Sequence, residues 1–271
     1  MKERLDVLLV SKGFFQSRER AKAAIMAGNV YIGGRIYDKA GTPVDVDSEI
    51  TVKGDTCPFV SRGGMKLEKA LQYFGFDLTD AVAMDIGAST GGFTDCMLQH
   101  GASKVYSVDV GYGQLDWKLR NDPRVINMEK CNVRYMETDE IPDRMDFISI
   151  DVSFISLRHI FPVASKLLKD GVEMVSLVKP QFEAGRDQVG KKGIVKDKSV
   201  HKEVILNVAG YAASEHLIPT GLTFSPMTGA KGNIEYLIKL RKAAEDEVFD
   251  FEAFEPLVDE VIEEAHGQLA K

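Results

Sequence analysis

The pattern of hydrophobic and polar positions changes at about residue 54, which divides the chain into two parts. In the first part, apolar residues such as Leu5 and Leu8 recur at helical spacing, and Ser17 is a suitable N-cap for a second helix. Three short strand-like runs follow, at residues 30–32, 35–37 and 50–52. This order predicts a small α+β domain over residues 1–54, and the Gly- and Pro-containing stretch that follows predicts a linker at residues 55–60.

The second part alternates apolar, strand-like runs with helical stretches. The strand candidates are residues 82–86, 105–110, 125–127, 147–152, 174–178, 217–224 and 235–240. The helical stretches are residues 66–74, 92–99, 157–168 and 200–214. This βαβ rhythm predicts a largely parallel sheet covered by helices on both faces. We therefore expect an α/β domain over residues 61–244.

The acidic charge of the chain is concentrated at its C-terminal end. The formal net charge is −7, but residues 245–271 alone hold ten acidic residues and one basic residue, Lys271. The first 244 residues therefore carry +2, and the overall charge does not exclude binding to nucleic acid. Apolar residues of this acidic tail, among them Phe254 and Ile262, favour a terminal helix docked on the body over a solvated segment.

The composition does not support a membrane protein, a disulfide scaffold or a metal protein. No apolar run approaches the roughly 20 residues that span a bilayer. The N-terminus lacks the apolar core of a signal peptide, so we expect a cytoplasmic protein. The three cysteines, Cys57, Cys96 and Cys131, are far apart, and the five histidines are scattered. Their spacing matches neither a disulfide framework nor a metal site.

A glycine-rich loop within residues 84–94 carries the most specific local signal. A strand there runs into the sequence Gly-Ala-Ser-Thr-Gly-Gly, which opens a helix. Such glycines let the backbone approach a ligand closely, and open α/β sheets bind ligands at this edge. Ser89 replaces the second glycine of a dinucleotide-binding G-x-G-x-x-G loop, and the Gly-Lys-Ser/Thr of a P-loop is absent.

Two acidic residues near this loop favour S-adenosylmethionine as the ligand. Asp85, two residues before Gly87, is expected to receive the ammonium group of a methionine moiety. Asp109, at the end of the next strand, is expected to bind ribose hydroxyls. The alternatives are a tight structural turn with incidental acids and an NAD enzyme.

Six blocks of sequence, in order, resemble the TlyA family. They are residues 61–67, 85–94, 109–115, 151–156, 178–183 and 232–236. The family consists of bacterial ribosomal RNA ribose methyltransferases, which are sometimes named haemolysins. The resemblance covers nearly the whole chain except the acidic tail. It implies a Rossmann-like class I methyltransferase domain of the FtsJ type, with a mostly parallel seven-stranded sheet, preceded by an RNA-binding domain of the ribosomal-protein S-four type. It also implies S-adenosylmethionine as cofactor and cytidine riboses of the ribosomal subunits as substrate.

The resemblance further implies a catalytic tetrad of Lys66, Asp151, Lys179 and Glu235. Asp151 and Lys179 both follow apolar strands, so both should emerge at the carboxyl edge of the sheet. A cation that ends a buried strand is costly unless it is used. A lysine partly withdrawn from water beside another cation can remove the proton of a ribose hydroxyl. Lys179 is therefore the expected base and Lys66 the second cation. The alternative for Lys66 is a surface lysine at the start of a helix, and the alternative for Asp151 and Glu235 is a loop cap or a salt-bridge partner.

The resemblance and the distribution of basic residues together give candidate binding positions. The residues expected to bind the cofactor are Asp85, Gly87, Ser89, Thr90, Gly91, Gly92, Phe93, Asp109, Asn132 and Asp151. The residues expected to contact RNA are Arg4, Arg18, Arg20, Lys22, Arg35, Arg62, Arg186, Lys191 and Lys192. The first 54 residues hold nine basic and seven acidic residues, so a solvated mixed-charge face is an alternative there. Phe154, Phe182 and Tyr236 are candidates either for stacking on a base or cofactor ring or for core packing.

Two other functions remain as alternatives. One is a ribosome-assembly factor that binds RNA without catalysis, against which the intact tetrad argues. The other is a membrane-active haemolysin, which neither a spanning segment nor a basic amphipathic helix supports.

Overall fold

The structure is a computed structural model that describes residues 2–15, 17–26, 28–53, 57–243 and 247–270. The chain divides into two compact units, Met1–Pro58 and Phe59–Lys271. Residues 55 and 56 of the predicted linker and residues 245, 246 and 271 of the acidic tail lie outside the described residues.

The N-terminal unit is a small α+β domain, as predicted. Its helices are α1 (Leu5–Ser11) and α2 (Arg18–Met26), and its strands are β1 (Lys2–Arg4), β2 (Val30–Ile32), β3 (Arg35–Tyr37), β4 (Pro43–Asp45) and β5 (Ile50–Val52). Strands β3, β2 and β5 form an antiparallel sheet, and β1 pairs with β4. Gly33 and Gly34 form the turn between β2 and β3, and both have the positive φ that a two-residue type I′ hairpin needs.

The second unit is built on a seven-stranded sheet. Its strands are β6 (Val82–Ile86), β7 (Lys104–Val108), β8 (Val125–Met128), β9 (Phe147–Ile150), β10 (Glu173–Val178), β11 (Leu217–Phe224) and β12 (Tyr236–Lys242). Their spatial order is β11-β12-β10-β9-β6-β7-β8. All neighbours run parallel except β12, which is antiparallel to both β10 and β11. The predicted α/β fold is thereby confirmed, with one reversed strand.

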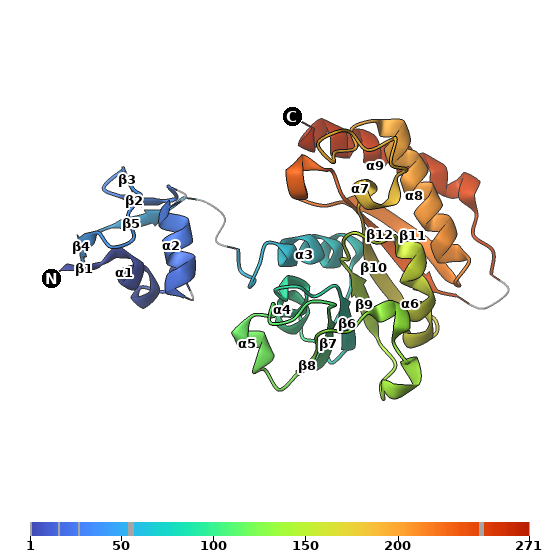
Figure 1. Ribbon diagram of the computed structural model, residues 1–271, viewed down its shortest axis with the longest axis horizontal. Helices are drawn as coiled ribbons and strands as arrows, with labels where there is room; N and C mark the ends of the chain where they lie inside the picture. Colours follow the sequence, from blue (N-terminus) through green and yellow to red (C-terminus); the bar gives the residue numbers. More distant parts are fainter. Residues whose placement is uncertain (1, 16, 27, 54–56, 244–246, 271) are drawn as a thin grey trace. The chain divides into compact units, whose positions relative to one another are not determined.

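Helices cover both faces of this sheet. They are α3 (Gly63–Phe74), α4 (Gly92–Gln99), α5 (Trp117–Arg120), α6 (Phe161–Leu167), α7 (Pro180–Glu183), α8 (Lys198–Ala213) and α9 (Phe251–Leu269). Helices α3 and α4 lie on one side of the sheet and α6 and α8 on the other (Figure 1). The largest core cluster is formed by the sheet with α6, α8 and α9.

Helix α9 confirms that the acidic tail docks on the body as a helix. Phe254, Val258 and Ile262 lie on its buried face, within the core cluster. Part of its acidic face pairs with α8, where Lys198 bonds Glu263 at 2.5 Å and Lys202 contacts acidic groups of α9. These ion pairs are exposed, so burial of the apolar face is the larger stabilising contribution.

Several element ends differ from the sequence prediction. Strand β7 ends at Val108 rather than at residue 110, because the carboxylate of Asp109 accepts the N–H of Gly111 at 2.6 Å and the chain turns there. The predicted helix at 157–168 is a 3₁₀ turn, Leu157–His159, followed by α6. Glu235 precedes β12 instead of opening it. Within the described part of the chain, no helix is long and apolar enough to span a bilayer.

Candidate active site

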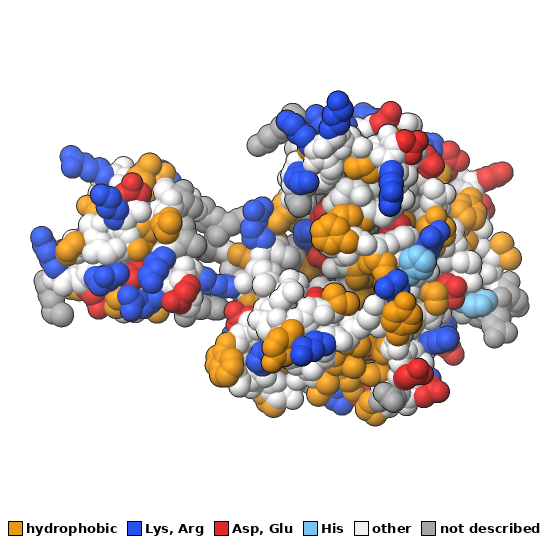
Figure 2. All heavy atoms as spheres, viewed as in Figure 1, with side chains coloured by type: hydrophobic (Ala, Val, Ile, Leu, Met, Phe, Trp, Pro, Cys, Tyr) orange, Lys and Arg blue, Asp and Glu red, His pale blue; other side chains and the backbone are white. Residues whose placement is uncertain are grey.

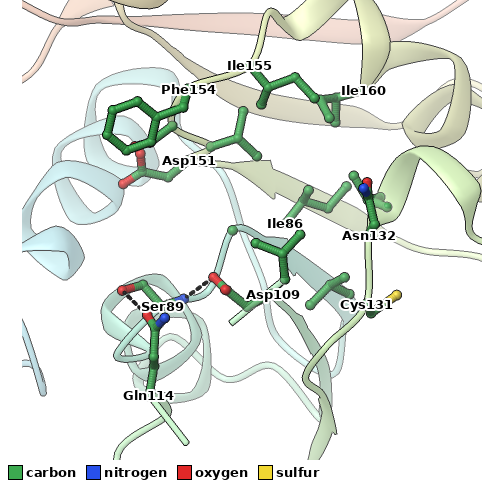
Figure 3. A pocket seen from close by; sticks show the side chains of 16 residues that line it. Ile86, Ser89, Asp109, Gln114, Cys131, Asn132, Asp151, Phe154, Ile155 and Ile160 are labelled. Carbon is green, nitrogen blue, oxygen red and sulfur yellow. Dashed lines mark hydrogen bonds between the residues drawn. The ribbon is translucent and has the colours of Figure 1, made fainter. Parts of the chain in front are cut away.

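A cavity of about 370 Å³ lies at the carboxyl ends of β6, β7 and β9. From β6 the chain continues to β7 on one side, and β9 returns on the other side of β6. Open α/β sheets bind ligands at such a reversal of strand order. The cavity is lined by apolar side chains, including Ile86 and Ile160, and by the polar side chains of Ser89, Asp109 and Asn132 (Figure 3).

The glycines of the loop after β6 are required by close approaches. Gly87 has φ +92°, and a Cβ there would lie 2.4 Å from the carbonyl oxygen of Asp151. Gly91 also has φ +92°, and a Cβ there would lie 2.3 Å from Cδ1 of Leu119. These positions exclude other side chains by backbone conformation and by space. Gly87 therefore lets the loop pack against the end of β9.

Asp109 holds this loop and faces the cavity. One carboxylate oxygen accepts the N–H of Ser89 at 2.8 Å, and the other accepts the N–H of Gly111. Asn132 follows β8 and also lines the cavity. Figure 3 shows Asp109 and Asn132 on one side of the cavity and Asp151 on the other. Asp109, the residue predicted to bind ribose hydroxyls, therefore lines this cavity together with Asn132.

Asp85, predicted to receive an ammonium group, lies behind the loop and outside the residues that line this cavity, and its Oδ1 is buried without a hydrogen-bond partner among the described residues. The residue is fully buried, and its Oδ2 accepts the N–H and the hydroxyl of Thr94 at 2.8 and 2.7 Å. Burial raises the pKa of this carboxyl to about 7. Because Thr94 lies in the first turn of α4, Asp85 accepts a backbone N–H that has no partner within the helix. This bond ties the end of the glycine-rich loop to β6.

A second, more polar cavity of about 200 Å³ adjoins the first. Its lining includes Ser61, Gly63, Thr90, Gly92, Phe93, Ser153 and Lys179. Gly87, Ser89 and Asp151 line both cavities, so the two spaces share one wall. Gly91, predicted to bind the cofactor, lines neither and instead contacts Leu119.

The predicted tetrad forms two ion pairs. Nζ of Lys179 lies 2.6 Å from Oδ1 of Asp151 and 2.9 Å from the hydroxyl of Ser153. Nζ of Lys66 lies 2.6 Å from Oε2 of Glu235, whose side chain is 3% exposed. Charges this far withdrawn from water need such partners. No partner for Lys179 among hydroxyls was expected from the sequence, since nothing in its spacing singles out Ser153.

The reversed strand β12 explains how Glu235 reaches the site. In the β10–β12 ladder, Val178 pairs with Tyr236. The residue after β10, Lys179, and the residue before β12, Glu235, therefore meet at the same edge of the sheet. The side-chain amide of Gln181 donates to Oε1 of Glu235 at 3.2 Å. Gln181 was missed as a site residue, although it lies in one of the six sequence blocks.

The short helix α7 holds the neighbouring loops in place. The carboxylate of Glu183 accepts the N–H of Leu157 at 2.8 Å and the hydroxyl of Ser156 at 2.7 Å. Burial is the main cause that raises the pKa of Glu183. The ring of Phe182 lies 4.8 Å from that of Phe154, measured between centroids. Helix α7 thus restrains the loop that follows Asp151.

The three aromatic candidates differ in exposure, and Phe182 is half-buried. Phe154 is 89% exposed and has φ +64°, a conformation rarely adopted by a bulky side chain. Tyr236 is fully buried, and its hydroxyl lies 2.7 Å from Nδ1 of His201. Stacking on a ligand is therefore excluded for Tyr236 in this conformation, and core packing applies instead.

Arg4 and Arg18, two of the predicted RNA contacts, share one structural partner. Arg4 and Arg18 both bond the buried carboxylate of Asp6, each with a contact of 2.9 Å, and they hold the pKa of that carboxyl well below its usual range. About half of each arginine side chain stays exposed. Arg35 is exposed, and Arg20 and Lys22 are half-buried. Figure 2 shows basic and acidic side chains mixed on the visible face of this unit.

The other basic candidates lie in the second unit. Arg62 is exposed just before α3, and one guanidinium nitrogen lies 3.5 Å from Sδ of Met227. Arg186 lines an open groove beside Phe154, and Lys191 and Lys192 are exposed on the loop that follows. These cations are exposed on the second unit.

Comparison with known proteins assigns both units. The FtsJ-like methyltransferase family matches residues 59–242, and the S4 domain matches residues 3–50. "Putative rRNA methyltransferase YqxC" of Bacillus subtilis is 52% identical over 269 residues, which cover 99% of this chain and 95% of that protein. "16S/23S rRNA (cytidine-2'-O)-methyltransferase TlyA" of Mycobacterium tuberculosis is 41% identical over 239 residues, 88% of this chain and 89% of that protein. The solved structure "Putative hemolysin from Streptococcus thermophilus" is 48% identical, with a TM-score of 0.78, and covers 98% of this chain and 96% of that chain.

Proposed function

Because the chain belongs to the TlyA family of FtsJ-like methyltransferases with an N-terminal S4 domain, we propose that it methylates the 2′-hydroxyl of cytidine in ribosomal RNA, with S-adenosylmethionine as methyl donor. The observation that carries the proposal is the position of the Lys179–Asp151 ion pair. Lys179 lines the polar cavity, and Asp151 lines both that cavity and the larger one beside it. A donor in one cavity and an acceptor in the other would meet at this pair.

The residues of the larger cavity fit S-adenosylmethionine. Its walls combine an apolar slot, formed in part by Val133 and Ile160, with carboxylates and an amide at its edges. Asp109 can accept ribose hydroxyls, Asn132 can bond a base edge, and the carboxylate of Asp151 can accept an ammonium group. When bound, S-adenosylmethionine supplies the electrophilic methyl group. Apolar walls with a few convergent polar groups are typical of such sites.

The polar cavity suits the attacking hydroxyl. A ribose hydroxyl must lose its proton as it is methylated, and a positioned amine can accept that proton once it has released its own proton to solvent. Nζ of Lys179 is the amine that lines this cavity, and Asp151 and Ser153 fix its position. The Lys66–Glu235 pair, joined to α7 through Gln181, orients the neighbouring groups. We assign proton transfer to Lys179 and orientation to the other three members of the tetrad.

RNA binding is proposed for the S4 domain together with the basic residues near the polar cavity. Exposed Arg35 in the first unit, and Arg62, Arg186, Lys191 and Lys192 in the second, can contact phosphates. Unstacked nucleotides are read by aromatic side chains in RNA-binding proteins, and the exposed ring of Phe154 is placed for this role. A ribosomal RNA substrate implies that the reaction takes place in the cytoplasm.

The test is transfer of labelled methyl groups. The full chain is incubated with labelled S-adenosylmethionine and unmethylated small and large ribosomal subunits, both intact and as naked RNA. Label that appears at a 2′-hydroxyl of cytidine and disappears with Lys179→Ala supports the proposal and identifies the subunit. Binding of RNA and cofactor without any transfer would contradict it and favour a ribosome-assembly factor.

A further inference from the structure

Gln181 lies between the Lys66–Glu235 ion pair and an open groove. Its Nε2 donates to Oε1 of Glu235 at 3.2 Å, while the other carboxylate oxygen of Glu235 bonds Lys66 at 2.6 Å. This bond sets the orientation of the flat amide, because the reverse orientation would place two acceptor oxygens face to face. The carbonyl oxygen of Gln181 is thereby directed away from Glu235.

That carbonyl oxygen, Oε1, is buried and has no hydrogen-bond partner among the described residues. Buried polar atoms nearly always have a partner, and an acceptor left without one is unfavourable. A buried acceptor beside a catalytic group, held in one orientation, is suited to a donor that arrives with the substrate. For comparison, the side-chain amide of Gln188 in the same segment has a partner at both ends. Its Nε2 donates to Glu203 at 2.8 Å, and its Oε1 accepts the N–H of Gly185.

An open groove next to Gln181 combines aromatic side chains with a cation. It has a volume of about 460 Å³ and is lined by Phe154, Gln181, Phe182, Ala184, Arg186 and Val189. Aromatic side chains stack on nucleobases, and a guanidinium beside them can meet a phosphate. Phe154, 89% exposed, is the most exposed aromatic side chain of this groove, and an incoming base must displace groove side chains to reach the buried oxygen of Gln181.

We propose that Gln181 selects the base of the methylated nucleotide, by accepting a hydrogen bond from the exocyclic amino group of cytosine at its Oε1. This inference rests on the proposed function, since it concerns the nucleotide whose ribose is methylated. Cytosine presents an amino donor at this position, whereas uracil presents a carbonyl acceptor. A buried acceptor therefore gains a partner from cytosine and faces a second acceptor from uracil, and sites that read a hydrogen bond discriminate strongly.

The experiment measures kcat/KM on three ribosomal RNA substrates that differ only at the target nucleotide. They carry cytidine, uridine, or a pyrimidin-2-one riboside, which lacks the amino group. For the wild-type chain we expect a preference for cytidine over both analogues of about tenfold or more. With Gln181→Leu, activity on cytidine should fall by about the same factor, and activity on the pyrimidin-2-one substrate should not fall further.

The control is Gln188→Leu, which removes an amide from the same segment that does not itself line the groove. It should keep the wild-type preference. Equal losses on all three substrates with Gln181→Leu would overturn the inference, because they would mean that Gln181 only supports Glu235. A wild-type chain that methylates cytidine and the pyrimidin-2-one equally would also overturn it while leaving the proposed function intact. A chain that methylates no ribosomal RNA would overturn both.

Discussion

Nζ of Lys66 lies 2.6 Å from Oε2 of Glu235, although 169 positions of sequence separate the two residues. Lys66 lies in the first turn of α3, near the start of the second unit, and Glu235 immediately precedes the last strand of its sheet. The contact joins the two ends of the domain, because the antiparallel orientation of β12 returns Glu235 to the edge where the parallel strands end. Four predictions, each for one residue of the second unit, can be measured.

Removing the amine of Lys179 should abolish methyl transfer and leave the cofactor cavity intact. Lys179→Ala removes the group that lines the polar cavity, and loss of a general base typically lowers kcat by roughly 10²–10⁴-fold. Cofactor affinity, measured by calorimetry, should change little, because Lys179 does not line the larger cavity. Lys169→Ala, which removes an exposed ion pair with Asp146, is the matched control and should keep full activity. Full activity of Lys179→Ala would remove the assignment.

Neutralising Glu235 should destabilise the protein as well as slow it. In Glu235→Gln, the half-buried amine of Lys66 loses its carboxylate partner, and breaking such a pair costs roughly 2–4 kcal/mol. Urea unfolding of the full chain measures the loss. Glu263→Gln breaks the exposed pair with Lys198 and should cost less than about 1 kcal/mol. Equal, small effects of the two substitutions would show that the Lys66–Glu235 pair is no more than a surface contact.

A methyl group on Gly87 should damage the cofactor loop. In Gly87→Ala, the new Cβ would meet the backbone of Asp151 at 2.4 Å, and the positive φ adds strain. We expect at least about a tenfold loss of affinity for S-adenosylmethionine, because Gly87 lines both cavities. Gly171→Ala has a similar φ, +74°, but no atom within 4 Å, so it isolates the cost of the backbone strain. Unchanged affinity in Gly87→Ala would mean that the loop can shift away from β9.

Acid should destabilise the catalytic unit through His201. Burial lowers the pKa of His201 to about 4, and its ring is enclosed by Tyr236, His266 and the carbonyl of Val195. The unfolded chain takes up a proton near pH 6.5 and the folded chain only near pH 4, so stability falls as the pH drops through this window. Between pH 7 and pH 5 this amounts to about 2 kcal/mol.

The measurement compares thermal unfolding of wild type and His201→Gln at pH 7 and pH 5. The variant should lose less stability on acidification than the wild type. Asp85 acts in the opposite direction, because its raised pKa makes stability fall as the pH rises from about 4 to about 7. The difference between the two proteins cancels that contribution, since Asp85 is present in both. An identical pH dependence would show that His201 titrates freely in the folded state.

The hairpin of the N-terminal unit shows what could be predicted from local sequence. The runs at 30–32 and 35–37 are strands β2 and β3 with the predicted bounds, because the Gly33–Gly34 turn between them restricts the possible backbone conformations. The glycine-rich loop, the βαβ rhythm and the docked acidic helix were likewise readable. Each depends on residues close together in the chain, whose periodicity and turn chemistry act over a few positions.

The roles of individual charged residues were less accessible. Asp85, predicted to bind the ligand, is buried and bonds Thr94 of α4, and Arg4 and Arg18, predicted to contact RNA, bond Asp6 while about half of each side chain stays exposed. An acid next to a glycine loop looks the same in sequence whether it faces the cavity or the helix behind it. Its direction depends on which face of the strand is covered, and that is set by packing.

The sequence by itself determined the two-domain order, the α/β class and the glycine-rich loop, and through its resemblance to a family it predicted the four residues of the tetrad. Only the tertiary structure decided that Lys179 pairs with Asp151 and Lys66 with Glu235, that Gln181 bonds Glu235, and that Asp151 lines both cavities. For the contacts of Glu235, the physical reason is the antiparallel orientation of β12. Its pairing with β10 joins positions more than 50 residues apart, as Gln181 and Glu235 are, and such long-range register leaves no periodic trace in the chain.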